Sequence, residues 1–188
     1  MRTVDEYWVP LRSHGGQTPA SRPLKAAYEL ADIFVTALCL LTLILTFACR
    51  TSRVEGASML PTLRDRQILL VSVYEGQLRR GDVAVVSGDG SGLGKPIVKR
   101  VIGLPGDVID IDFGAGVVYR NGEPLDEPYT AAPTNREEGM RFPLTVEPGR
   151  CFLLGDNRNN STDSRSPRVG QVDRRDIMRV IFPILKGP

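Results

Sequence analysis

The sequence predicts a mostly β domain preceded by one membrane-spanning helix. Two observations carry this prediction: an apolar run over residues 30–49, and the short β-branched runs, separated by Gly and Pro, that follow it. Beyond the apolar run no stretch keeps a long helical period. At 188 residues the chain has room for one compact domain and an anchor, but not for two full-sized domains.

The apolar run from Leu30 to Cys49 has one charged residue, Asp32, near its start. A helix of about 20 residues rises about 30 Å, which is the thickness of the hydrocarbon core of a bilayer. A buried core helix would usually have a polar face. A cleaved secretory signal would have a shorter apolar region and a small-residue cleavage site, and Thr46–Cys49 matches such a site poorly. We therefore expect a permanent anchor over residues 30–49.

Residues 1–29 are polar, contain Pro and Gly and lack apolar periodicity, so we expect a flexible tail. Basic residues flank the apolar run on both sides, and they do not decide which way the anchor points. The net charge of +2, with no long basic run, gives no argument for a nucleic-acid partner. The spacing of the three cysteines predicts neither a zinc site nor a disulfide framework.

Six runs beyond the anchor have the length and composition of strands: 67–74, 82–87, 96–104, 107–113, 116–125 and 150–156. Within the fifth run, Asn121-Gly122 is a strong hairpin signal. The segment Ser87–Lys95 is polar and glycine-rich, so we expect a mobile hairpin loop that does not pack.

Ser58 lies in a turn-rich segment, Gly56–Leu63, soon after the anchor. Taken alone, a serine in such a segment is most often a turn residue whose hydroxyl binds the backbone. A nucleophilic serine needs a base. The single histidine, His14, lies on the other side of the expected anchor, so a catalytic Ser58 would need a different base.

Lys99 is the best remaining candidate for that base. In a strand it shares one face with Ile97 and Val101, while Arg100 points to the other face. Burial among β-branched side chains disfavours an ammonium group and lowers its pKa, which makes a lysine usable as a base near neutral pH. A lysine that protects an edge strand from aggregation fits the same pattern, and the residues alone leave both interpretations open.

The loop Gly155–Arg165 follows an apolar strand and is rich in Asp, Asn, Ser and Arg. Such a loop is a common place for binding and catalytic groups, although a plain polar loop has the same composition. The hydroxyl of Ser161 can hold a neutral lysine in position, and Asp163 with Arg165 can form an ion pair that fixes the loop.

Taken together, these segments resemble the bacterial type I signal peptidases, which are serine–lysine peptidases, and in particular their short Gram-positive-like form. The resemblance runs through the ordered segments 58–63, 80–83, 99–107, 118–122 and 155–165, and covers nearly all of the chain after the anchor.

The resemblance implies that Ser58 is the nucleophile, Lys99 the general base and Ser161 the hydroxyl that orients the lysine. It also implies that the backbone N–H of Ser58 helps to form the oxyanion hole. Some members have a serine at the position of Gly56 that adds a donor, and this chain lacks that hydroxyl. The remaining residues with implied roles form the nucleophile loop or support the site: Met59, Pro61, Arg100, Asp156, Asn157, Asp163 and Arg165.

The same resemblance implies a β-rich catalytic core over 54–188, with a smaller β insertion at about 106–149. It places the tail in the cytoplasm, the anchor in the bacterial plasma membrane as a single pass, and the core outside. The implied partners are signal peptides of secreted pre-proteins cut after Ala-x-Ala-type sequences, the lipid bilayer and, as a candidate, the secretion translocon. No nucleic acid, metal or cofactor is expected.

Three other functions are compatible with parts of this pattern. A self-processing repressor of the LexA type would carry a DNA-binding domain where this chain has its apolar run. A conjugation-type or pilin-processing peptidase of the same superfamily would share both chemistry and fold. A catalytically silent, membrane-tethered β domain could bind exported chains, but it would not need Ser58, Lys99 and Ser161 together.

Overall fold

The computed structural model describes residues 21–72 and 77–185, in a first unit that ends at Leu43 and a second that begins at Ile44. Residues 1–20 of the predicted tail 1–29, which include His14, lie outside the described residues. From Ser21 onward the expected tail is helical, because helix α1 spans Ser21–Ala48. The helix begins before the apolar run because Ser21 and Pro23 suit a helix start and the next residues are good helix formers.

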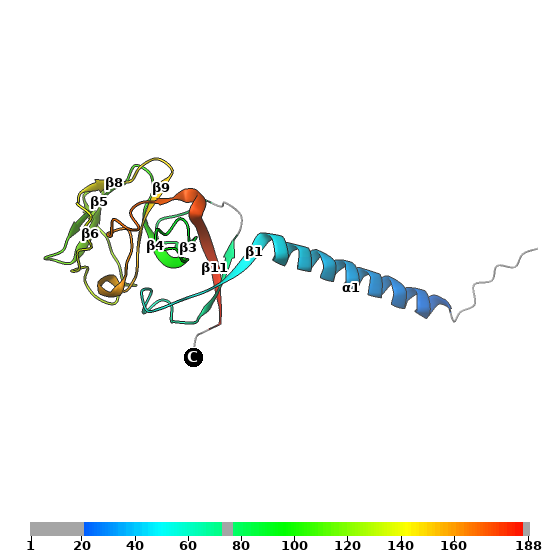
Figure 1. Ribbon diagram of the computed structural model, residues 1–188. Coiled ribbons are helices and arrows are strands. Elements are labelled where there is room, and N and C mark those ends of the chain that lie inside the picture. Colours follow the sequence, from blue (N-terminus) through cyan, green and yellow to red (C-terminus); the bar gives the residue numbers. More distant parts are fainter. Residues whose placement is uncertain (1–20, 73–76, 186–188) are drawn as a thin grey trace, which may run out of the picture. The chain divides into compact units, whose positions relative to one another are not determined.

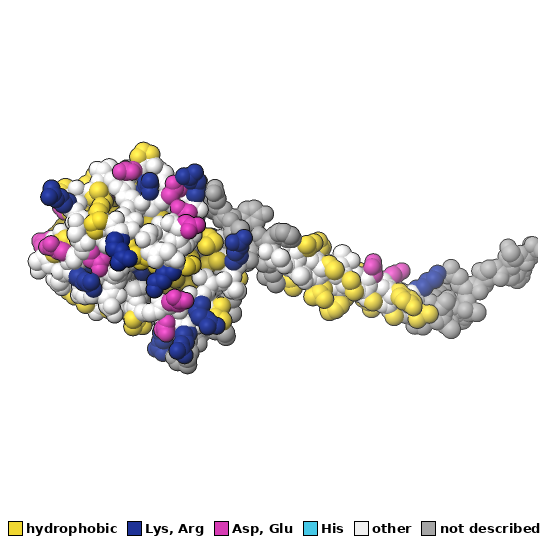
Figure 2. Space-filling view, in the orientation of Figure 1, with side chains coloured by type: hydrophobic (Ala, Val, Ile, Leu, Met, Phe, Trp, Pro, Cys, Tyr) yellow, Lys and Arg dark blue, Asp and Glu magenta, His cyan; other side chains and the backbone are white. Residues whose placement is uncertain are grey.

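Residues Leu24–Leu43 of α1 are long and apolar enough to cross a membrane, and none of that stretch is buried within the protein. Apolar side chains lie along the described part of the helix, with charged ones near its beginning (Figure 2). A helix apolar on all sides is unusual at the surface of a soluble protein, and its exposure here is compatible with a membrane anchor.

The second unit has a seven-stranded sheet in the order β1-β2-β11-β3-β4-β9-β10, in which every neighbouring pair is antiparallel (Figure 1). The strands are β1 (Cys49–Arg53), β2 (Ile68–Ser72), β3 (Val83–Val86), β4 (Ile97–Gly103), β9 (Arg150–Leu154), β10 (Val172–Asp173) and β11 (Ile177–Leu185). Two short 3₁₀ helices lie at Arg158–Asn160 and Arg174–Asp176.

Strand β1 begins at the last residue of the run predicted as the anchor, so the sheet starts at Cys49 and not after residue 53. Its sequence is too polar to indicate a strand, but Cys49 pairs with Ser72 and Arg53 with Ile68 along β2. Strand β11 was also absent from the six predicted strands. It contains Pro183, which weakens a strand signal, and its pairing with β2 is irregular there.

A second, four-stranded antiparallel sheet lies between β4 and β9 in the sequence, in the order β7-β6-β5-β8. Its strands are β5 (Val108–Asp112), β6 (Val117–Arg120), β7 (Glu123–Pro124) and β8 (Leu144–Thr145). The β6–β7 hairpin turns at Asn121-Gly122, where both residues have positive φ, 55° and 83°. This is the two-residue turn that the Asn-Gly pair favours.

Strand β4 lies at the centre of the packing, and all seven of its residues are buried. On one side Ile97 and Val101 join a core with Leu153 of β9. Val98 belongs to a second core, and Ile102 to a third that includes side chains of the second sheet. A strand covered on both faces keeps water from both sides of its residues, which is the condition that Lys99 needs.

The loop Ser87–Lys95 packs, contrary to the expectation from its polar sequence. Ser91 is fully buried, and its Oγ lies 2.9 Å from the carbonyl oxygen of Gly88 and 2.7 Å from that of Lys95. Leu93 contacts the core beside β4. The prediction failed because the Ser91 hydroxyl shares its one proton between these two carbonyl oxygens and accepts the N–H of Leu93 at 3.1 Å, which lowers the cost of burying these polar groups.

Candidate active site

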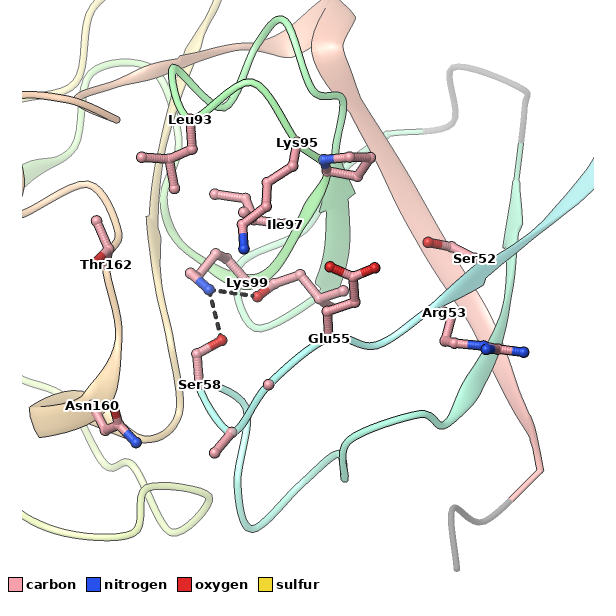
Figure 3. Close-up of a pocket in the computed structure, with 14 residues that line it drawn as sticks. Ser52, Arg53, Glu55, Ser58, Leu93, Lys95, Ile97, Lys99, Asn160 and Thr162 are labelled. Carbon is pink, nitrogen blue, oxygen red and sulfur yellow. Dashed lines mark hydrogen bonds between the residues drawn. The ribbon is translucent and has the colours of Figure 1, made fainter.

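Ser58 and Lys99 are in direct contact. Ser58 lies in the turn that follows β1, and Lys99 lies in the middle of β4. Lys99 Nζ is 2.8 Å from Ser58 Oγ and 2.9 Å from the carbonyl oxygen of Val98, to which it donates (Figure 3). A neutral lysine placed in this way can accept the proton of the serine hydroxyl.

The environment of Lys99 favours its neutral form. The side chain is 3% exposed, which decides between the two interpretations that the sequence left open, and burial lowers its pKa from 10.5 to about 8. Three carboxylates, Asp163, Glu138 and Asp156, act in the opposite direction and raise the pKa, while Arg165 lowers it further. Burial is the largest effect, so a useful fraction of Lys99 is neutral near physiological pH.

The turn that carries Ser58 has an unusual backbone. Gly56 has a φ of +83°, which favours glycine, and its N–H donates to Asp65 Oδ1 at 2.7 Å. Asn157 holds the other side, since its N–H donates to the carbonyl oxygen of Ser58 at 2.9 Å and its amide group to that of Ala57 at 3.1 Å. Among the described residues, the N–H of Ser58 has no acceptor, so it is available to a ligand.

Of the two predicted residues that follow Ser58, Met59 anchors the same turn, whereas Pro61 is exposed. Met59 is 1% exposed and belongs to the core that includes Val98, and the Leu60–Pro61 peptide bond is cis.

Arg100 and Asp156 connect β4 to the loop after β9. Arg100 Nε and Nη2 donate to the two carboxylate oxygens of Asp156 at 2.8 and 2.6 Å, and a further guanidinium N–H donates to the carbonyl oxygen of Gly81 at 2.7 Å. Thr62, from the segment of the nucleophile, donates its hydroxyl to Asp156 Oδ2 at 2.5 Å. One carboxylate therefore binds both the strand of Lys99 and the segment of Ser58.

Asp163 organises the rest of the loop. Its Oδ2 accepts hydrogen bonds from the N–H of Gly155 at 3.0 Å and from the hydroxyl of Ser161 at 2.8 Å. Arg165 Nε donates to Oδ1 at 2.8 Å, and both members of this ion pair are fully buried. Among the described residues Lys99 Nζ bonds only to Ser58 and Val98, so the structure does not show the direct contact between Ser161 and the lysine that the resemblance implies; the Ser161 hydroxyl donates to Asp163 instead.

A cavity of about 210 Å³ opens beside the Ser58–Lys99 contact. Figure 3 shows Leu93, Lys95 and Ile97 on one side, Glu55 on another, and Asn160 and Thr162 from the loop after β9. Among the described residues, no group of three or more His, Cys, Asp or Glu side chains could hold a metal ion.

A model of the family described as signal peptidase, peptidase S26, matches residues 27–184. This chain belongs to the signal peptidase S26 family. It is similar to signal peptidase I S of Bacillus subtilis strain 168, with 38% identity over 153 residues that cover 76% of this chain and 80% of the relative. Signal peptidase I of Bacillus licheniformis is 35% identical over 162 residues, which cover 80% of this chain and 83% of that relative. Among solved structures, a signal peptidase I from Enterococcus faecalis V583 is 30% identical, covers 57% of this chain and 98% of that one, and has a TM-score of 0.46.

Three residues of this signal peptidase contact the site although the sequence did not indicate them as site residues: Thr62, Tyr129 and Glu138. Thr62 binds Asp156, and the ring of Tyr129 lies 4.0 Å from the guanidinium carbon of Arg100. Glu138 accepts a hydrogen bond from the N–H of Asp163 at 3.3 Å. Thr62 lies within the segment that drew attention to Ser58, whereas the other two lie in a stretch without strand or helix signals.

Proposed function

We propose that this chain is a membrane-anchored serine endopeptidase that removes N-terminal signal peptides from exported pre-proteins, with Ser58 as nucleophile and Lys99 as general base. The observation that carries the proposal is the 2.8 Å contact between Ser58 Oγ and the buried Lys99 Nζ. Membership of the signal peptidase family supports the substrate class, because the relatives of this chain are named signal peptidase I.

In the first step neutral Lys99 accepts the hydroxyl proton of Ser58 while Oγ forms a bond to the scissile carbonyl carbon. The carbonyl π electrons move to oxygen, and the resulting oxyanion needs preorganised donors. The N–H of Ser58, which has no acceptor among the described residues, is well suited to be one donor. Gly56 has no hydroxyl, so a second donor must be a backbone group or water.

In the second step the Lys99 ammonium gives its proton to the amine nitrogen of the leaving chain, and the carbon–nitrogen bond breaks. The signal peptide is then attached to Ser58 as an ester. Lys99, neutral again, takes a proton from water as the water oxygen attacks the ester carbon, and return of that proton to Oγ frees Ser58. The steps balance with water as the only co-reactant.

A preference for small side chains next to the cut is supported by membership of the signal peptidase family, because the sequence resembles enzymes that cut after Ala-x-Ala-type sites. The cavity of about 210 Å³ beside Ser58, with Leu93 and Ile97 in its walls, is where we expect these side chains to bind. We therefore propose substrates of the Ala-x-Ala type.

The membrane placement follows from the same function. We propose that α1 crosses the plasma membrane once, with the tail in the cytoplasm and the peptidase domain outside, since exported chains present their signal peptides there. The lipid bilayer and the signal peptide are then partners, and the secretion translocon is a candidate third. The exposed apolar stretch Leu24–Leu43 supports the anchor.

Cleavage of a pre-protein with an Ala-x-Ala site tests the proposal. Wild type, Ser58→Ala and Lys99→Ala would be compared in detergent, with a pre-protein whose two alanines are replaced by Leu as the substrate control. We expect cleavage of the Ala-x-Ala substrate by wild type alone. Robust cleavage by Lys99→Ala would refute the base. A folded wild type that binds the pre-protein without cutting it would favour the silent binding domain.

A further inference from the structure

The first half of β4 has a strand partner on one side only. Residues 97–99 pair with residues 84–86 of β3, whereas the pairing of β4 with β9 begins at Arg100. Residues 97–99 also line the cavity of about 210 Å³, and the nucleophile segment 55–58 forms another of its walls. An extended peptide can add to an open strand edge of this kind and form main-chain hydrogen bonds with it.

A peptide bound in this way presents its side chains alternately to two sides, because the side-chain period of a strand is two residues. When the two alanines of an Ala-x-Ala site point into the cavity, the side chain of the middle residue, x, points away from it and towards the rim. The groups at the rim therefore decide which middle residues the enzyme accepts.

Two opposite charges lie at this rim. Glu55 and Lys95 line the cavity and are exposed, and among the described residues neither side chain has an ion-pair or hydrogen-bond partner. Figure 3 shows Lys95 extending from its loop towards Lys99, with Glu55 on the segment that leads to Ser58. Arg53 also lines the cavity, but its guanidinium points away from the catalytic pair. Glu55 and Lys95 are thus available to a charged ligand.

The backbone on both sides of Glu55 is fixed. Val54, which precedes it, forms two backbone hydrogen bonds of 2.9 Å with residues 66–67. Gly56, which follows it, donates its N–H to Asp65 Oδ1 at 2.7 Å. The carboxylate of Glu55 therefore extends into water from a defined backbone position on one wall of the cavity.

Lys95 is held in the same way on another wall, because it ends the packed loop 87–95. Its carbonyl oxygen accepts the hydroxyl of the buried Ser91 at 2.7 Å. Within this loop a Cβ atom at Gly92 would lie 1.9 Å from the carbonyl oxygen of Arg168, so the loop packs closely against the chain there. Fixed backbone positions reduce the entropy that the protein loses when the two side chains bind a substrate.

We propose that Glu55 and Lys95 are specificity-determining residues that recognise the charge of the middle residue of an Ala-x-Ala site. Glu55 attracts a basic x and repels an acidic one, and Lys95 does the opposite. The inference rests on the proposed function, because it assigns both residues to the substrate of that reaction. It adds a selection by charge at the rim to the selection by size in the cavity.

Three pre-proteins that differ only at x, with Lys, Gln or Glu there, test the proposal. Their kcat/KM values are measured in non-ionic detergent for wild type, Glu55→Gln and Lys95→Gln, and the values for the Lys and Glu substrates are divided by that for the Gln substrate. In Glu55→Gln the relative value should fall for the Lys substrate and rise for the Glu substrate. Lys95→Gln should do the reverse. Each change should be about 1.5- to fivefold, the range of exposed ion pairs.

High salt provides a check that a change of cavity shape would not pass. At about 1 M salt, where the Debye length is about 3 Å, the relative values of wild type and both variants should converge. Glu123→Gln and Arg79→Gln are the matched controls, since both positions are exposed and neither lines this cavity. Their relative values should equal those of wild type. An equal loss for all three substrates in Glu55→Gln and Lys95→Gln would indicate a structural role and overturn the proposal.

A binding measurement separates this inference from the proposed function. Fluorescein-labelled peptides with the same three sites are titrated with full-length Ser58→Ala protein, alone and combined with Glu55→Gln or Lys95→Gln, and Kd is obtained from fluorescence anisotropy. If the Kd ratios change as expected but wild type cuts none of the pre-proteins, the proposed function fails and the charge recognition stands. Unchanged ratios in the binding assay and in the cleavage of pre-proteins that wild type does cut would refute the charge recognition alone.

Discussion

Arg100 and Asp156 form an ion pair with two hydrogen bonds, of 2.8 and 2.6 Å, that joins β4 to the loop after β9. Asp156 is fully buried, and Arg100 is 9% exposed. Arg100 is adjacent to Lys99 in the strand, and Asp156 also binds Thr62 on the nucleophile segment. The pair therefore determines how the parts of the site meet, although neither residue contacts Ser58.

Loss of one member of this pair should be strongly destabilising. In Asp156→Asn the guanidinium of Arg100 stays in place without its counter-ion, so we expect the free energy of unfolding to fall by about 3–5 kcal/mol. Urea unfolding of the solubilised protein measures this. Glu147→Gln breaks the exposed pair with Arg150 and should cost less than about 1 kcal/mol. Equal costs in the two variants would contradict the structural role of the buried pair.

The rate of cleavage should depend on pH through Lys99. Its pKa of about 8 means that the ammonium predominates below pH 8 and cannot accept the Ser58 proton. We expect kcat/KM to rise roughly tenfold per pH unit between about pH 6 and 7 and to level off above the pKa. A profile between pH 5.5 and 10 measures this. A rate that is flat from pH 6 to 8 would exclude Lys99 as the titrating base.

The same buried amine should destabilise the folded protein at neutral pH. The folded pKa of about 8 lies below the unfolded value of 10.5, so the unfolded chain binds the proton more tightly. Wild-type stability should therefore rise as the pH increases from 8 to 10.5, and the penalty is fully present below pH 8. Lys99→Met removes it and should gain up to about 3 kcal/mol at pH 7 while losing activity.

Thermal unfolding at several pH values tests this gain. The difference between Lys99→Met and wild type should shrink as the pH rises above 8. Lys95→Met, at an exposed lysine of the same cavity, is the control and should change stability little at any pH. A Lys99→Met protein no more stable than wild type would show that the lysine has enough favourable contacts to offset its burial.

The sequence was sufficient to predict β4, because a short β-branched run bounded by turn residues is typical of a strand. It left the burial of Lys99 open, since an edge-strand lysine fits the same pattern. It also singled out Ser58 and the 155–165 loop, whose residue types suit the chemistry. These are local signals. The contact between Ser58 and Lys99 was inferred from the family resemblance. The two residues are 41 positions apart, and no local sequence pattern indicates that they lie close together in the fold.

Features that depend on the tertiary path were not predictable. Strand β1 has a polar sequence, and it is a strand because β2 offers it a partner. Glu138 and Tyr129 lie in a segment without periodicity, and they contact the site only because the fold brings Glu138 to Asp163 and Tyr129 to Arg100. Ser91 is a polar residue in a glycine-rich loop, and its burial depends on carbonyl groups that the fold brings to its hydroxyl.

Ser161 gives the last prediction, because its hydroxyl donates to Asp163, whose carboxylate raises the pKa of Lys99. In Ser161→Ala the Asp163 carboxylate loses one of the donors that fix it, and the field at Lys99 changes with its position. We expect kcat to fall on the order of tenfold or more, with a change in unfolding free energy of about 1 kcal/mol or less. Steady-state kinetics and urea unfolding of the same preparations measure both quantities.

Ser164→Ala is the matched control, three residues along the same loop. Ser164 Oγ accepts the buried N–H of Leu153 at 3.0 Å, so its loss leaves a buried donor unsatisfied and should cost about 1–3 kcal/mol of stability. The activity per folded molecule should be nearly unchanged, because this hydroxyl contacts neither Asp163 nor Lys99 among the described residues. The two variants should therefore differ: Ser161→Ala should lower turnover, and Ser164→Ala should lower stability. If Ser161→Ala lost stability and kept its turnover, Asp163 would not need that hydroxyl, and the path from Ser161 to Lys99 would be refuted.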